Sequence, residues 1–272
     1  MGPIILTVAA VGAELTLEDQ PNLPVTPHAL ARDAAACREA GASIYHLHVR
    51  DGSGAPTMAP EAFRAGLQAI GGATDLIVQF TSGGGVADTE EERIAPLDLR
   101  PEMATLTTGT VNFGDAVFHN PPGLISRFYE RMGSLGIAPE FEIFEAGMIA
   151  TALRVAAEAD HHLHFDFVLG VPGAMPAWDD AIHFLSGHLP QGATWSATGI
   201  GRSHLSVAET AVALGGHART GFEDVLYYGP GEKAVSNAQL IERVARMARA
   251  AGREVATPER AREMLRLEPR KG

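Results

Sequence analysis

The chain has 272 residues, 46% of them hydrophobic, and a formal net charge of −12 at pH 7. This length supports one sizeable core and lies near the upper limit for a single domain. The acidic balance argues against a nucleic-acid partner, because phosphate binding needs a basic face and no useful run of Lys or Arg appears before the C-terminal tail.

The chain contains one cysteine, Cys37, so no intrachain disulfide can form and no zinc-finger spacing exists. Cys37 lies in an Ala-rich helical stretch and is expected to be a small buried side chain. The apolar residues 4–10 follow no basic residues, so we interpret them as a strand and not as a secretion signal. No window approaches the roughly 20 apolar residues of a membrane-spanning helix. We therefore expect a cytoplasmic protein without a membrane partner.

Short apolar runs alternate with longer, amphipathic stretches along the whole chain, as is typical of βα units around a parallel sheet. The predicted strands are Ile4–Ala10, Ile44–Val49, Leu76–Thr81, Met103–Thr107, Glu140–Phe144, Leu163–Leu169, Thr194–Ala197 and the run around His217–Thr220. The predicted helices are near 27–40, 60–70, 90–97, 121–135, 147–159, 178–187, 204–214 and 236–251. Some of these helices begin with clear signals, such as Thr26-Pro27 and Ser236-Asn237.

Eight strands, each followed by a helix, predict an α/β fold of the (β/α)8 TIM-barrel type, with residues 1–272 as a single domain. The alternative is an open doubly wound sheet, but the first strand lacks the Gly-x-Gly-x-x-Gly turn of a dinucleotide site. One more helix is expected at about 257–267, followed by a charged, frayed tail at 268–272.

A pair of histidines ends the second predicted strand. His46 and His48 are two residues apart, so their side chains point to the same face. In a TIM barrel the carboxyl ends of the strands carry the active site. A single inward histidine is usually a hydrogen-bonded core residue, whereas two on one face beside Arg50-Asp51 favour a shared metal ion.

A catalytic zinc site usually has three protein ligands and an open position, so a third ligand must come from elsewhere. Glu223 is the best candidate, because it follows the eighth strand and only the first strand separates the second from the eighth in a closed barrel. Alone, Glu223 and Asp224 would fit a solvated acidic loop equally well. An open zinc position polarises a carbonyl and stabilises an enolate, which favours lyase or acyl-transfer chemistry as well as hydrolysis.

Other strand ends also carry polar or small residues. Glycines after the third strand let backbone amides approach an anion closely. Arg202 follows the seventh strand, where many barrels bind phosphate. A turn-forming role explains the Gly-x-Gly-Arg segment at 199–202 equally well. The further candidates at strand ends are Glu14, Ser82, Gly83, Gly84, Gly85, Thr105, Thr107 and Thr108.

Several other histidines are interpreted as structural or solvated. His164 and Asp166 share one face of the sixth strand and could form a second polar layer inside the barrel. His161 and His162 precede that strand and are expected to be solvated.

With these residues assembled, the chain resembles the family of β-keto acid cleavage enzymes over nearly its whole length. The stretches that carry the resemblance are TVAAVGAELT (7–16), AGASIYHLHVRD (40–51), RPEMATLTTGTVNFG (100–114), FDFVLGVPGAMP (165–176) and RTGFED (219–224).

The resemblance implies a (β/α)8 barrel, usually a homotetramer, with zinc bound by His46, His48 and Glu223. It implies a retro-Claisen type reaction in which a β-keto acid and acetyl-CoA give acetoacetate and a new acyl-CoA. Zinc would hold the carboxylate and keto oxygens of the substrate. The residues do not identify the physiological keto acid, and the same ligands also bind cobalt, nickel or manganese.

The resemblance also implies roles for other residues. Asp224 would be the base, directed and kept ionised by Arg219, because an adjacent arginine lowers the pKa of a carboxylate. Ser82 and a threonine would steady the substrate carboxylate and the developing oxyanion; we assign Thr107, although Thr105 faces the same way. The other expected substrate contacts are Gly83, Gly84, Asn112 and Arg202.

Glu14 matches the position that meets the amino group of the substrate in one family member. We expect Glu14 to be buried, and the charge of a buried carboxylate would be uncompensated if it faced an apolar part of the substrate. The hypothesis that follows is a cationic β-keto acid as substrate.

Two alternative functions stay open. An amidohydrolase-type hydrolase also uses His-x-His in a barrel, but on its first strand, whereas here the first strand leads into Val11-Gly12-Ala13-Glu14. A non-catalytic metal-binding or CoA-binding barrel is the other alternative, because a fold alone does not establish catalysis.

Overall fold

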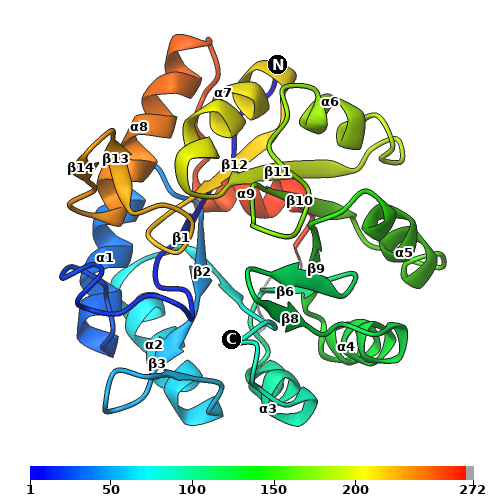
Figure 1. The fold of residues 1–272 in the computed structure, drawn as a ribbon, viewed down its shortest axis with the longest axis horizontal. Helices are drawn as coiled ribbons and strands as arrows, with labels where there is room; N and C mark the ends of the chain where they lie inside the picture. The colour runs from blue at the N-terminus through cyan, green and yellow to red at the C-terminus, as the bar shows by residue number, and fades with distance from the viewer. Residues whose placement is uncertain (268–272) are drawn as a thin grey trace.

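A computed structural model describes residues 1–267, which form a closed eight-stranded parallel barrel (Figure 1). The barrel closes because β1 pairs with both β2 and β12. The barrel strands in chain order are β1 (Leu6–Ala9), β2 (Ile44–Leu47), β5 (Ile77–Phe80), β6 (Met103–Thr107), β9 (Ala138–Ile143), β10 (His164–Leu169), β11 (Thr194–Gly199) and β12 (His217–Thr220). The predicted barrel is confirmed, and the doubly wound alternative is wrong. The predicted tail, 268–272, lies outside the described residues.

Helices surround the barrel in Figure 1. They are α1 (Pro27–Ala40), α2 (Pro60–Ala73), α3 (Glu90–Ile94), α4 (Pro122–Leu135), α5 (Gly147–Val155), α6 (Ala181–Ser186), α7 (His204–Leu214) and α8 (Asn237–Ala250), whereas α9 (Pro258–Leu265) covers one end of the barrel. The single helix predicted at 90–97 is instead α3 followed by the 3-10 helix η1 (Ala95–Leu99). The change falls next to Pro96, which lacks the N–H that would continue the α-helical hydrogen bonding.

Three short hairpins follow barrel strands at their carboxyl ends. They pair β3 (Val49–Arg50) with β4 (Pro56–Thr57), β7 (Val111–Phe113) with β8 (Ala116–Phe118), and β13 (Tyr227–Gly229) with β14 (Glu232–Lys233). The strand predicted at Ile44–Val49 is therefore interrupted at His48, which lies between β2 and β3. This break places His48 at the mouth of the barrel.

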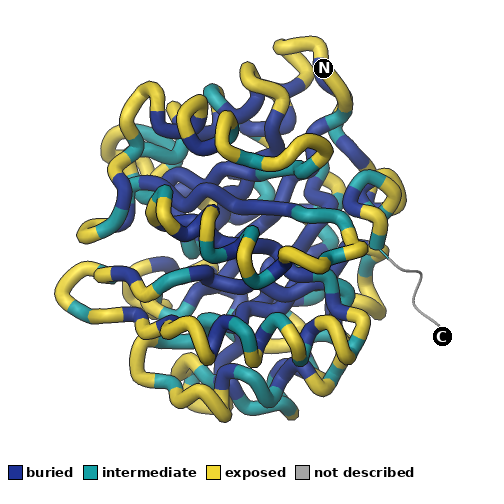
Figure 2. The backbone as a smooth tube through the Cα atoms, turned by 90° about the vertical axis from the view of Figure 1, so that its right-hand side faces the viewer, coloured by how far each residue is buried: buried dark blue, intermediate teal, exposed yellow. Residues whose placement is uncertain are grey.

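The interior of the barrel is apolar at one end and polar toward the other. The amino ends of four strands contribute Ile5, Ile44, Ile77 and Met103, which pack against α9. Figure 1 shows α9 lying across the ring, and Figure 2 shows the buried strands enclosed by exposed helix surfaces. With this end closed by apolar side chains, the polar end is the place for ligands.

The second polar layer expected inside the barrel is present. The Asp166 carboxylate accepts hydrogen bonds from the Ser196 and Thr198 hydroxyls, each at 2.7 Å. The Nε2 atom of His164 lies 3.1 Å from a carboxylate oxygen of Glu140. His161 is exposed as predicted, but His162 is only half-exposed. The Nε2 atom of His162 lies 2.8 Å from the Thr194 hydroxyl, which takes that ring partly out of solvent.

The Cys37 side chain is fully buried, as predicted. No helix within residues 1–267 combines the length and hydropathy needed to cross a membrane.

Candidate active site

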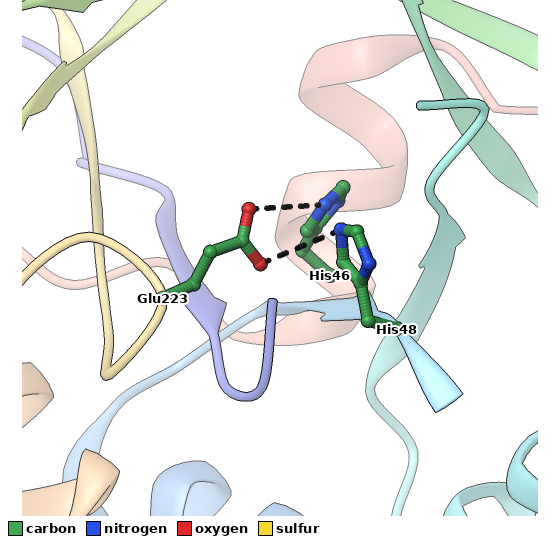
Figure 3. Close-up of side chains that lie close together, drawn as sticks. All are labelled: His46, His48 and Glu223. Carbon is green, nitrogen blue, oxygen red and sulfur yellow. Dashed lines mark ion pairs between the residues drawn. The ribbon is translucent and has the colours of Figure 1, made fainter. Parts of the chain in front are cut away.

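His46, His48 and Glu223 converge at the mouth of the barrel (Figure 3). One Glu223 carboxylate oxygen lies 3.7 Å from His46 Nε2, and the other lies 3.7 Å from His48 Nε2. The potential ligand atoms of the three residues all lie within 4.8 Å of one another. The metal ligand set predicted from strand spacing is therefore brought together.

These three side chains fit a divalent transition-metal ion. Two ligand atoms that each lie about 2.1 Å from a tetrahedral zinc ion are roughly 3.4 Å apart, close to the distances here. Glu223 Oε2 is buried without a hydrogen-bond partner among the described residues. An unpaired buried carboxylate oxygen is costly unless a cation or donor meets it, so the donor set is suited to a metal.

Hydrogen bonding and burial keep the imidazoles in the metal-binding form. The Nδ1 atom of His46 lies 2.8 Å from Gln79 Oε1, so Nδ1 carries the proton and the Nε2 lone pair faces Glu223. Burial, opposed by Glu223, lowers the pKa of His46 to about 3 and lowers that of His48 as well. Sequence reasoning missed Gln79, although its inward position on β5, paired with His46, follows from strand alternation.

Two glycines allow the Glu223 loop to lie against β1. A Cβ atom at Gly221 would lie 1.9 Å from the Ala9 carbonyl oxygen, and one at Gly12 would lie 2.8 Å from Glu223 Cγ. Gly12 also has a positive φ of 64°. The close approach lets the Glu223 N–H donate to the Ala9 carbonyl at 3.2 Å, which directs the carboxylate toward β2.

Arg219, inward-facing on β12, contacts three carboxylates. Its Nε and Nη2 atoms donate to the two carboxylate oxygens of Asp224, at 3.2 and 3.0 Å. Nη2 also donates to a carboxylate oxygen of Glu223. Nη1 lies 3.5 Å from a carboxylate oxygen of Glu142. With all three carboxylates ionised, the one guanidinium leaves a net charge of 1 − 3 = −2, and burial opposes this state by raising the pKa of both Asp224 and Glu142 to about 7. A divalent cation beside Glu223 would balance that charge.

The pKa of Asp224 departs from the sequence-based expectation. Burial raises it to about 7, and the opposing attraction of Arg219 is too weak to keep it low. At neutral pH the Asp224 carboxylate is therefore only partly ionised, because desolvation offsets much of the attraction by Arg219. By contrast, Arg219 and the imidazoles overcome burial at Glu223 and lower its pKa to about 2.

Glu142 is a site residue that sequence reasoning missed. It lies on β9, accepts a hydrogen bond from Thr107 Oγ1 at 2.6 Å and has a pKa that burial raises to about 7. The alternation of Glu140 and Glu142 on one face of their strand was the available signal, of the same kind as His46 and His48.

The three candidate metal ligands line one pocket together with Arg219, Asp224, Glu142, Glu14, Gly83 and Gly84. Most other lining side chains are apolar, including Phe113, Phe118, Phe144, Val168, Val171 and Ile200. Glu14 is exposed, and the expectation that it is buried is wrong. It lies in the loop after β1, where the pocket meets solvent.

Five of the residues that were assigned a catalytic or substrate-binding role do not line this pocket. Ser82 and Thr105 are buried beside it, where the Ser82 N–H donates to Thr105 Oγ1 at 3.3 Å, and Thr107 lies behind Glu142. The Ser82 hydroxyl has no partner among residues 1–267. Asn112 and Arg202 are exposed, in β7 and in the 3-10 helix η2 (Gly201–Ser203).

Known sequences similar to this chain act on β-keto acids. The chain is 44% identical to a 3-keto-5-aminohexanoate cleavage enzyme from Fusobacterium nucleatum, with 98% of this chain and 99% of that protein covered. It is 38% identical to a 3-oxoadipate:acetyl-CoA acetyltransferase from Cupriavidus necator, with 97% and 95% covered.

Solved structures agree on the fold. The apo structure of ObcA superimposes with a TM-score of 0.78 at 18% identity, covering 91% of this chain and 66% of that one. The 3-dehydroquinate dehydratase from Aquifex aeolicus superimposes with a TM-score of 0.55 at 11% identity, covering 91% and 98%. The sequence profile of the beta-keto acid cleavage enzyme family matches residues 3–267. With that match and these full-length relatives, the chain belongs to the beta-keto acid cleavage enzymes.

Proposed function

We propose that this enzyme converts a β-keto acid and acetyl-CoA to acetoacetate and a new acyl-CoA, with a zinc ion bound by His46, His48 and Glu223. The observation that carries the proposal is the position of Asp224, held by two hydrogen bonds from Arg219 in the pocket that the three metal ligands line. A bound divalent ion would supply a Lewis acid that stabilises the enolate form of the substrate.

The residues of the chain account for the proton transfers. Asp224 takes a proton from the carbon between the keto and carboxylate groups, and this carbon then attacks the thioester carbonyl of acetyl-CoA, releasing the CoA thiolate. The thiolate attacks the original keto carbon, and the bond between that carbon and the former carbanion carbon breaks. Acetoacetate forms when Asp224 returns the proton, so atoms and charges balance. A base with a pKa near 7 is well matched to this task.

Isotopic labelling of the acetyl group tests the proposed reaction. With [13C]acetyl-CoA and an unlabelled β-keto acid, the label should appear in acetoacetate and the new acyl-CoA should be unlabelled. An amidohydrolase-type hydrolase would form no new acyl-CoA, and a non-catalytic barrel would bind without turnover. Either result, over a broad panel of β-keto acids, would reject the proposal.

Glu14 supports a cationic β-keto acid as the substrate. Its side chain is exposed and lines a pocket with mainly apolar walls, where its carboxylate would meet a positive group on the far end of a substrate. Steady-state assays of Glu14→Gln on charged and neutral β-keto acids of equal length test this. An unchanged preference for the charged substrate in the variant would reject the assignment.

The remaining polar residues are proposed to serve binding. Ser82 and Thr107 stabilise the substrate carboxylate and the developing oxyanion, and Thr107 does so through Glu142, which lines the pocket and accepts its hydrogen bond. Gly83 and Gly84 border the substrate, and Thr105 acts indirectly by accepting from the Ser82 N–H. Asn112 and Arg202, which are exposed, meet the co-substrate outside the pocket, Arg202 at an anionic group. Single Ser82→Ala and Arg202→Ala variants separate these roles: the first should lower kcat, and the second should raise the KM for acetyl-CoA.

The proposal includes a homotetrameric assembly in the cytoplasm. Light scattering of the purified protein measures the assembly directly, and a mass other than four chains would correct it. Metal analysis of protein purified without added metal would distinguish zinc from cobalt, nickel or manganese.

A further inference from the structure

One buried amide joins the two loops that follow β1 and β12. Asn237, the first residue of α8, is fully buried, and its Oδ1 atom accepts a hydrogen bond from the Phe222 N–H at 2.8 Å. Its Nδ2 atom donates to the Ala10 carbonyl at 3.2 Å. Phe222 directly precedes the metal ligand Glu223, so Asn237 contacts the backbone of the ligand loop and the segment beside it.

The same amide group is tied to α1. Nδ2 of Asn237 lies 3.2 Å from both carboxylate oxygens of Asp33, and Asp33 accepts a further hydrogen bond from the Tyr45 hydroxyl at 2.9 Å. Tyr45 is fully buried and directly precedes His46 on β2. Successive strand residues point to opposite faces, so Tyr45 fixes β2 from outside the barrel while His46 points inward.

The orientation of the amide follows from its partners. Oδ1 faces an N–H donor, whereas Nδ2 faces a carbonyl and a carboxylate, so the flipped amide would place donor against donor and acceptor against acceptor. Burial raises the pKa of Asp33 to about 6 in spite of its donors. At neutral pH it is mainly an acceptor, as the network needs.

We propose that Asn237 and Asp33 are positioning residues, which set the distance between the histidine-bearing strand β2 and the Glu223 loop and so set the affinity of the metal site. The inference rests on the proposed metal site. Asn237 holds the loop through Phe222, and Asp33 holds β2 through Tyr45, while neither contacts the pocket. Outside the barrel, the contact between the Asn237 and Asp33 side chains links the Glu223 loop to the strand that carries His46.

Zinc affinity of the folded protein tests the inference. Metal-stripped wild type and Asn237→Ala would be titrated with zinc against a chromophoric chelator, with the folded fraction of each measured by circular dichroism. We expect the zinc Kd of the variant to rise by about 10- to 100-fold, the range found when groups that orient metal ligands are removed.

Exchange of the two partners provides a rescue. Asn237→Asp keeps an acceptor for Phe222 but places two carboxylates together, so zinc affinity should fall. In the double variant Asp33→Asn/Asn237→Asp, the new amide donates to the new carboxylate and still accepts from Tyr45, so part of the affinity should return, while the lost donation to the Ala10 carbonyl is not restored. This pair keeps the test decisive if Asn237→Ala does not fold.

Gln20→Ala is the matched control. Gln20 is another buried amide, and its hydrogen bonds link loop segments at the Ala234 carbonyl and the Asn22 N–H, not at the backbone of residues 222–224. Its loss should lower thermal stability but leave the zinc Kd unchanged. Equal zinc affinity in wild type and Asn237→Asp, or equal losses in Gln20→Ala and Asn237→Ala, would overturn the inference. A wild type that binds no zinc would instead reject the metal site itself.

Discussion

Arg219 directs Asp224 through two hydrogen bonds, from Nε at 3.2 Å and from Nη2 at 3.0 Å, while Nη2 also donates to Glu223. One guanidinium therefore fixes both the proposed base and a proposed metal ligand. Arg219 thereby couples the position of the proposed base to that of the proposed metal site.

Asp224→Asn should lower kcat by about 10²- to 10⁴-fold, the usual contribution of a general base. The amide keeps the size of the side chain but cannot accept the substrate proton. Zinc content should stay the same, because Glu223 and both histidines are unchanged. Steady-state kinetics with metal analysis would check both points, and a variant with wild-type kcat would remove Asp224 from the proposed role.

The pH dependence of kcat/KM should show an ascending limb between pH 5 and pH 7. Burial raises the pKa of Asp224 to about 7, and only the deprotonated carboxylate can act as base, so activity is lost as pH falls through that value. A bound cation would favour the charged carboxylate and move the limb lower. A profile that is flat from pH 5 to 8 would contradict this assignment.

Gly12→Ala should displace Glu223 and weaken zinc binding. A Cβ atom there would lie 2.8 Å from Glu223 Cγ, and φ is 64°. Gly114→Ala is the matched control, because Gly114 has a φ of 62° but open space around the new methyl group. Both variants should lose some thermal stability through backbone strain, whereas only Gly12→Ala should raise the zinc Kd. Equal zinc affinities in the two variants would show that Gly12 does not matter for the ligand.

Gln79→Leu should also weaken zinc binding, by about 10- to 100-fold, because His46 Nδ1 would lose the acceptor that fixes its tautomer. Gln79→Glu keeps an acceptor at the same position and should bind zinc at least as tightly as wild type. Competition titration on both variants checks the prediction, which fails if the leucine variant keeps the wild-type Kd.

The barrel could be predicted because its strands and helices differ in hydrophobic periodicity along the chain. The same alternation predicted that His46 and His48 face one way, and the short path around a closed barrel placed Glu223 near them. Each of these conclusions needs only local geometry and the order of the strands.

Other features depend on packing that periodicity does not encode. The pKa of Asp224 is set by its burial as well as by the neighbouring Arg219. Strand alternation places Gln79 and Glu142 on the inner face, but what each does depends on its partner from a neighbouring strand. The exposure of Glu14 depends on the path of the loop after β1.

Metal removal followed by stoichiometric reconstitution tests the central claim most directly. Enzyme stripped with a chelator should form no acyl-CoA from a β-keto acid and acetyl-CoA, and one equivalent of zinc per chain should restore turnover. The His46→Ala/His48→Ala variant should not recover under the same conditions. Full turnover by metal-free enzyme, or recovery of the double variant with one equivalent of zinc, would contradict the account.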